Sequence, residues 1–155
     1  MVQKLRERSQ GEGGFTLVEL LVVMLILGLL AAIAIPSFFN QREKAKDADA
    51  KAAARTAQTA IETYATGNQG SYSNATIAGL RDIEATLNDS NLSAVTPTGT
   101  GDGYTVTVTS DGNAANAFSI TRSNTGTTTL TCTAEGVDGC PADDDDPDAL
   151  GNWGD

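Results

Sequence analysis

The strongest constraint on this chain is one long apolar segment near its start. Residues Phe15–Ile35 hold a single ionisable side chain, Glu19. A helix of about 20 apolar residues, rising about 1.5 Å per residue, spans the hydrocarbon core of a bilayer. The sequence therefore predicts a transmembrane helix over residues 15–35. Gly28 and Pro36 interrupt the helical pattern. We expect a kink at them, because Gly is a poor helix former and Pro lacks the N–H that would bond the preceding turn.

Glu19 is the unusual residue of this segment. A carboxylate in hydrocarbon costs roughly 2–3 kcal/mol or more, and such groups usually have a partner. The helix itself offers no nearby cation. One interpretation places the carboxyl group at the headgroup boundary. The other pairs it with the α-amine of Phe15 in a neighbouring molecule, a group that exists only if the chain is cut after Gly14 and that is mostly protonated near neutral pH.

The residues around Glu19 carry a family resemblance. The run Gly14-Phe15-Thr16-Leu17-Val18-Glu19-Leu20-Leu21 resembles the processing site of type IV pilins and the related pseudopilins. The resemblance implies a prepilin peptidase that removes a leader, residues 1–14, by cutting between Gly14 and Phe15, and that N-methylates Phe15. It also implies that Glu19 is the assembly carboxylate and that Pro36 is the family's helix-kinking proline. Pilins of this kind join a pilus assembly machinery and form a homo-oligomeric helical filament.

The leader indicates how the chain is oriented in the membrane. It carries Lys4, Arg6 and Arg8 against Glu7 and Glu12, a net charge of +1. Positive charge keeps that side of a transmembrane helix in the cytoplasm. We therefore expect a precursor that crosses the cytoplasmic membrane once, with its soluble part outside. The resemblance implies that it then moves to a cell-surface pilus.

Composition narrows the classes of function. The formal net charge is −10, so the residues after Gly14 carry −11. Contacts to phosphate need Lys and Arg, and we therefore expect no direct nucleic-acid binding by the isolated subunit. The chain has no His, the commonest acid/base side chain, and no phosphate-binding loop or nucleophile elbow. We expect neither an enzyme nor a bound cofactor, apart from the calcium considered below.

Residues 36–66 continue as the soluble half of the helix. Ala is frequent there, and five apolar residues recur at helical spacing on one face. They are Ala50, Ala53, Ala57, Ile61 and Tyr64. The charged residues of Arg42–Arg55, among them Asp47, mostly occupy other faces, and we interpret them as a solvated surface. The alternatives are a contact between subunits, or attraction to anionic lipid near Arg42–Lys46.

The remaining pattern predicts a small sheet. Residues 67–101 form a connection with a short helix near Thr76–Asn88 and a loop over Ser90–Gly101. Residues 102–133 then alternate apolar and hydroxyl side chains in three runs, which predicts a three-stranded antiparallel meander with one apolar face. The alternating apolar residues are Tyr104, Val106, Val108, Phe118, Ile120, Leu130 and Cys132. We expect an α+β fold, in which a long N-terminal helix packs against about three antiparallel strands, as in the pilin fold.

Residues 134–155 form an acidic terminal segment. Cys132 and Cys140 suggest one disulfide in an exported domain, with two buried free thiols or a metal pair as alternatives. The Asp-rich run Asp143–Asp148 is interpreted as a solvated tail, with calcium as the alternative because calcium prefers oxygen ligands. The ending around Trp153 also resembles that of major pseudopilins of type II secretion, which bind calcium there. Trp153 is interpreted as a packing residue, with a surface aromatic as the alternative.

These observations together predict a structural subunit of a type IV pilus. In this interpretation the chain is a prepilin, cleaved after Gly14, methylated at Phe15 and polymerised through its N-terminal helix. The alternative among filament proteins is a major pseudopilin of a type II secretion system. The alternative from another class is a membrane-anchored adhesin or binding module.

Overall fold

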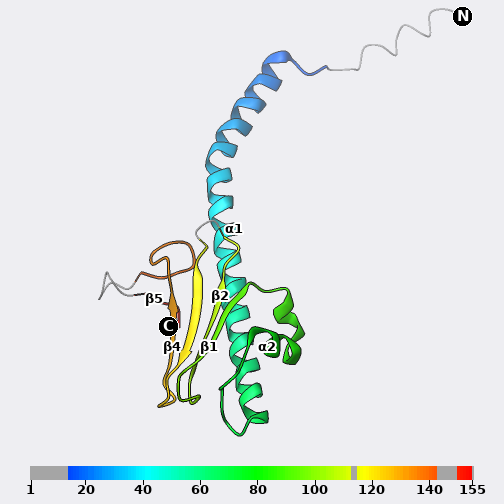
Figure 1. Ribbon diagram of the computed structural model, residues 1–155. Coiled ribbons are helices and arrows are strands. Elements are labelled where there is room, and N and C mark those ends of the chain that lie inside the picture. Colours follow the sequence, from blue (N-terminus) through cyan, green and yellow to red (C-terminus); the bar gives the residue numbers. More distant parts are fainter. Residues whose placement is uncertain (1–13, 113–114, 143–149, 155) are drawn as a thin grey trace, which may run out of the picture. The chain divides into compact units, whose positions relative to one another are not determined.

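A computed structural model describes residues 14–112, 115–142 and 150–154. The chain forms two compact units, Met1–Phe39 and Asn40–Asp155. Helix α1, Leu17–Gly67, is one helix of 51 residues that belongs to both (Figure 1). The second unit adds two short helices and an antiparallel sheet. The predicted α+β class, with one long N-terminal helix packed on a sheet, is confirmed.

Within the second unit, α1 buries the small face that its spacing predicts. Ala50, Ala57 and Ile61 are buried, and Ala53 and Tyr64 pack at the edge of the same core. Ala favours the helix and lets the sheet approach closely. Four Thr hydroxyls on this part of α1 bond the carbonyl one turn back. The helix ends where the Asn68 side chain donates a 2.8 Å bond to the Tyr64 carbonyl.

The connection after α1 holds the expected helical residues. Helix α2, Ile77–Ile83, begins at Thr76, whose hydroxyl accepts a 3.1 Å bond from the Gly79 N–H. A 3₁₀ helix, η2, follows at Ala85–Asn88. Glu84 between them has an extended backbone, so the pattern near Thr76–Asn88 makes two short helices instead of one.

The sheet has five strands, and the expectation of about three is wrong. The strands are β1 (Leu92–Pro97), β2 (Tyr104–Thr109), β3 (Ala117–Arg122), β4 (Thr128–Cys132) and β5 (Gly151–Asn152). They lie in sequence order, and each pairs antiparallel with the next. The three predicted strands are the central ones. The two additional strands cover the edges of the meander.

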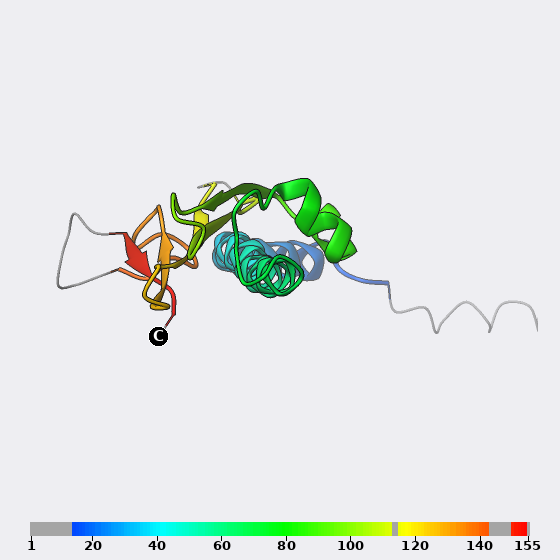
Figure 2. The ribbon, with the colours of Figure 1, turned by 60° about the horizontal axis from the view of Figure 1, so that its bottom comes forward.

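The alternation of the central strands separates two faces. The apolar face includes Val106 opposite Ile120 and Val108 opposite Phe118, all buried. Figure 2 shows the Asn40–Gly67 part of α1 along one face of the sheet, and the buried residues of both form one core. The other face carries paired hydroxyl groups, which lie 3.0 Å apart in Thr105 and Thr121.

Strand β1 replaces the loop expected over Ser90–Gly101. Ser, Thr, Pro and Gly in that segment are typical of loops. An edge strand nevertheless tolerates Pro, because one side of its backbone needs no partner, and Pro97 is the last residue of β1. Leu92 is buried and Val95 packs against the core, so two apolar contacts hold the strand in place.

Candidate functional site

The start of α1 holds the residues expected to act in processing and assembly. Thr16 and Glu19 bond each other reciprocally. The Glu19 N–H donates to the Thr16 hydroxyl at 3.2 Å, and Glu19 Oε2 accepts from the Thr16 N–H at 3.2 Å and from its hydroxyl at 3.1 Å. This is a capping box, which satisfies backbone donors that a helix start leaves free. The Thr-x-x-Glu spacing is the sequence signal for this capping role of Glu19, a role that was not among the predictions from the sequence.

Gly14 and Phe15 lie just before this cap. Both are exposed, and neither belongs to a helix or strand. A Cβ added to Gly14 would meet no atom within 4 Å. The peptide bond between them is therefore sterically open at the start of an apolar helix. The roles in cleavage and methylation remain predictions for these two residues.

The first unit exposes a largely apolar helical surface. Every large apolar side chain from Phe15 to Phe39 is between 49% and 80% exposed. The helix is long and apolar enough to cross a membrane, with none of its most hydrophobic window buried. Burial of each such side chain is worth about 1.5–3 kcal/mol. This surface therefore needs lipid or other protein around it.

Gly28 and Pro36 lie inside this continuous helix. A Cβ on Gly28 would meet nothing within 4 Å, so no contact with another described residue requires its small size. Pro36 cannot donate a backbone hydrogen bond to the preceding turn. The kink expected at these residues stays a prediction.

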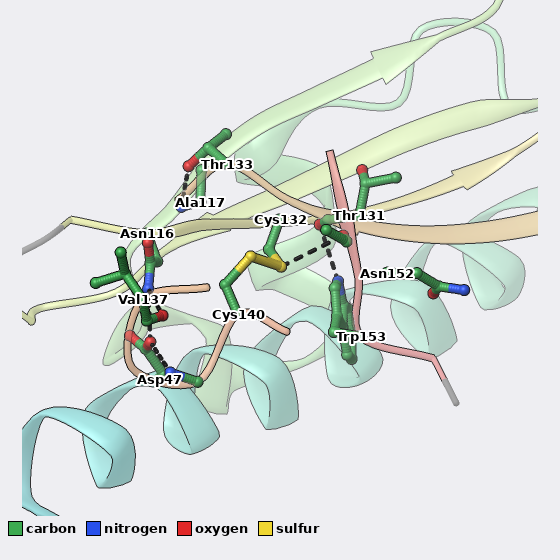
Figure 3. Close-up of a disulfide and its surroundings, with 12 residues drawn as sticks. Asp47, Asn116, Ala117, Thr131, Cys132, Thr133, Val137, Cys140, Asn152 and Trp153 are labelled. Atoms are coloured by element: carbon green, nitrogen blue, oxygen red, sulfur yellow. Dashed lines mark hydrogen bonds between the residues drawn. A yellow bond between two sulfur atoms is a disulfide. The ribbon is translucent and has the colours of Figure 1, made fainter. Parts of the chain in front are cut away.

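The second unit contains a disulfide, as Figure 3 shows. Cys132 and Cys140 are bonded, with their Cα atoms 5.8 Å apart. The bond joins the end of β4 to the following loop. Both cysteines are buried. The predicted pairing is confirmed.

A buried carboxylate ties the disulfide loop to α1, and the interpretation of Asp47 as part of a solvated surface is wrong. Asp47 is 2% exposed. Its Oδ2 accepts bonds from the Asn116 side chain at 2.7 Å and from the Gly139 N–H at 2.9 Å. A Cβ on Gly139 would lie 2.7 Å from Asp47 Cβ, so only Gly allows this approach. One turn along α1, Lys51 donates a 2.6 Å bond to the Gly139 carbonyl.

Trp153 fixes the C-terminal residues against this loop and the helix. Its indole N–H donates to the Thr131 carbonyl at 2.9 Å, and its ring meets Phe118 edge to face with centroids 5.9 Å apart. Arg55 lies over the same ring at 5.1 Å. Lys51 lies beside both rings, and burial lowers its pKa, although Asp47 partly opposes that effect. Trp153 is thus a packing residue, as interpreted from the sequence.

A second polar cluster lies in the same core, around Glu62 of α1. The hydroxyls of Tyr72 and Tyr104 donate to its two carboxylate oxygens at 2.7 and 3.0 Å. The two rings meet edge to face at 4.8 Å. Burial, followed by the bond to Glu62, raises the pKa of both phenols above the usual range. Arg122 forms an ion pair with Glu62 at 3.6 Å.

The calcium interpretation falls on residues that the structure does not describe. The run Asp143–Asp148 lies wholly within residues 143–149, outside the described ranges. Among the described residues, no group of three or more His, Cys, Asp or Glu side chains is placed to hold a metal ion.

Comparison with known proteins locates the similarity in the apolar start of the chain. A family model of the prokaryotic N-terminal methylation motif matches residues 10–35. The type IV major pilin protein PilA of Myxococcus xanthus is 43% identical over 33% of this chain and 23% of its own length. The type IV narrow pilus major component PilA5 of Thermus thermophilus is 48% identical over 32% of this chain and 45% of its own.

A secretion protein shows a similar partial match. The type II secretion system core protein G of Pseudomonas aeruginosa is 37% identical over 37% of this chain and 40% of its own length. The chain thus spans less than half the length of each of these three relatives. Pilin and secretion relatives thus match similar shares of this chain.

Proposed function

We propose, from the N-terminal methylation segment that this chain shares with type IV pilins and pseudopilins, that it is a structural subunit of a type IV pilus. The observation that carries the proposal is the apolar surface of α1, which is exposed from Phe15 to Phe39 and begins directly after Gly14. Such a surface is stored in lipid as a precursor and buried among copies of itself in a filament. The role is structural, not enzymatic.

The proposed sequence of events starts with a membrane-held prepilin. Its leader lies in the cytoplasm and its second unit outside the cytoplasmic membrane. A prepilin peptidase cuts the exposed Gly14–Phe15 bond and N-methylates Phe15. The pilus assembly machinery then transfers the processed subunit into a homo-oligomeric filament at the cell surface.

Glu19 has two successive roles in this proposal. In the single chain it caps its own helix through Thr16, and both of those bonds end on Oε2. In the filament the same carboxylate pairs with the α-amine of Phe15 on a neighbouring subunit. Within an apolar bundle an unpaired carboxylate is costly, so this pairing sets the axial register of the helices.

The test is intact-mass analysis of fibres sheared from cells that produce the full chain. The expected mass lacks residues 1–14, includes one methyl group on the new N-terminus and lacks the two hydrogens lost to the Cys132–Cys140 disulfide. Tandem mass spectrometry locates the methyl group on Phe15. Recovery of the protein only as a soluble monomer that retains its leader would contradict the proposal.

The major pseudopilin of a type II secretion system is the second candidate, because protein G relatives match a similar share of the chain. It forms short periplasmic fibres in place of long surface fibres. It also predicts that calcium raises the melting temperature of the purified chain, through the Asp143–Asp148 region. Long surface fibres, together with an unchanged melting temperature in calcium and in chelator, would exclude this candidate.

A further inference from the structure

A cavity of about 250 Å³ opens on the second unit between α1, the end of η2 and the end of β2. Its lining combines two kinds of side chain. Ala50 and Val108 are buried and apolar, with the partly buried Ala53 beside them. Three exposed carboxylates complete the lining: Asp49, Asp89 and Asp111. An apolar base under several carboxylates suits a long side chain with a cationic end. The aliphatic part of such a side chain packs on the apolar base, and its charged end pairs with the carboxylates.

None of the three carboxylates is paired with a cation within the part of the chain that the structure describes. The one cation of the lining, Lys46, is bonded to Glu43 at 3.1 Å. No hydrogen bond or ion pair joins Asp49, Asp89 or Asp111 to another described side chain. Three negative charges around one cavity repel each other, so a cation from outside would be favoured there.

The chain itself offers such a cation. Five of its seven Lys and Arg residues after Gly14 lie within Arg42–Arg55 of α1. Lys46 and Lys51 are bonded within the chain, and Arg55 lies over Trp153. Arg42 and Lys44 are exposed, and neither is bonded to another described residue. Of the two, Arg42 has the planar guanidinium group, which can donate two parallel hydrogen bonds to one carboxylate.

We propose that this cavity receives the Arg42 side chain of a second copy of the chain. The inference rests on the proposed filament, because a contact between two different surfaces of identical subunits generates an open helical assembly. It also offers a favourable contact between subunits that carry a net charge of −11 after Gly14, since Arg42 of one faces the acidic cavity of the next. For Arg42, the proposal favours a subunit contact over the alternatives of a solvated surface and of attraction to anionic lipid.

A charge exchange in the full chain tests the contact. We expect Asp89→Arg alone and Arg42→Asp alone to lower the yield of sheared fibres at least about tenfold, because each places like charges together. The double variant, Asp89→Arg with Arg42→Asp, restores the yield. Asp102→Arg and Lys44→Asp are the matched controls. Asp102→Arg makes the same charge change as Asp89→Arg but outside the cavity. Lys44→Asp replaces the neighbouring exposed cation in the same way as Arg42→Asp. Both leave the yield near that of the unmodified chain.

A second measurement does not depend on the yield. In fibres carrying Asp89→Cys and Arg42→Cys, an intermolecular disulfide forms and gives a ladder of multimers without reductant, whereas Asp102→Cys with Arg42→Cys does not. Normal fibres from Asp89→Arg, or single defects without rescue and without the ladder, would overturn the inference. If chelator lowers the fibre yield of the unmodified chain as much as Asp89→Arg does, and the double variant does not restore the yield, the cavity would bind a divalent cation instead of Arg42. If the unmodified chain forms no fibres, the proposed function itself fails.

Discussion

Asn116 donates a 2.7 Å hydrogen bond to the buried carboxylate of Asp47, across 69 residues of sequence. The bond joins the residue before β3 to α1. The same carboxylate oxygen accepts a hydrogen bond from the Gly139 N–H, so this one acceptor links α1 to the sheet and to the disulfide loop. The second unit therefore depends on a charged residue in its core as well as on apolar packing.

We expect Asp47→Ala to lower the free energy of unfolding by about 2–4 kcal/mol, because the buried Asn116 amide and the partly buried Gly139 N–H lose their shared acceptor. Asp49→Ala is the matched control. It removes an exposed carboxylate two residues along the same helix and should change the stability by less than about 0.5 kcal/mol. Urea titration of the processed chain in detergent measures both. Equal effects of the two variants would mean that the Asp47 network contributes nothing special.

Gly151→Ala should destabilise the second unit by about 1–3 kcal/mol through overpacking. A Cβ there would lie 2.8 Å from Cys140 Sγ and 3.1 Å from Cys132 Sγ, and would also press on the Pro141 carbonyl oxygen. Gly99→Ala is the control, because a Cβ at that position meets nothing within 4 Å. Urea titration of both variants checks the prediction. A stable Gly151→Ala protein would show that β5 can move away from the disulfide at little cost.

Two substitutions distinguish the two roles proposed for Glu19, which are capping its own helix and pairing with a neighbouring subunit. Glu19→Gln keeps a capping-box side chain but removes the charge, so we expect a processed monomer in the membrane and no fibres. Thr16→Ala removes the cap partner and keeps the carboxylate. It should cost about 0.5–2 kcal/mol of helix stability but leave fibre formation intact. Immunoblots of sheared and membrane fractions distinguish these outcomes, and fibres from Glu19→Gln would refute the pairing with the α-amine of Phe15.

Stability should fall at alkaline pH because of the Tyr cluster around Glu62. Burial raises the pKa of Tyr104 in the folded chain above its ordinary value. The unfolded chain therefore releases the phenolic proton first, and stability present below pH about 10 is lost as the pH rises beyond it, by up to about 1.4 kcal/mol per pH unit. Urea titrations across this range should show a smaller loss for Tyr104→Phe. An identical pH dependence of the variant would assign the loss to other groups.

Local pattern was sufficient for the elements whose side chains repeat. Alternation over Tyr104–Cys132 correctly predicted the three central strands, because one face of each is buried and the other is not. It missed β1 because hydroxyl residues, Gly and Pro in that segment also suit a loop. It missed β5, whose two residues are too few to show any period. Edge strands are specified by their neighbours more than by their own sequence.

The residues of the candidate site also differ in how far they could be predicted from local sequence. The residues proposed to act in processing and assembly, Gly14, Phe15 and Glu19, belong to one continuous motif, so a single stretch of sequence was enough to propose them. Asp47 lies among charged residues, and its partners are 69 and 92 residues away. No local pattern distinguishes such a carboxylate from a solvated one, because only the folded chain brings its donors together.

Trp153 is the chain's single tryptophan, and its ring meets Phe118 and lies near Lys51 and Arg55, in the segment that follows the disulfide loop. Its fluorescence therefore reports whether the C-terminal residues remain packed against the sheet and α1. Reductant that releases these residues should shift the emission to longer wavelength. The state of each subunit's terminus is thereby readable in intact fibres without an attached dye.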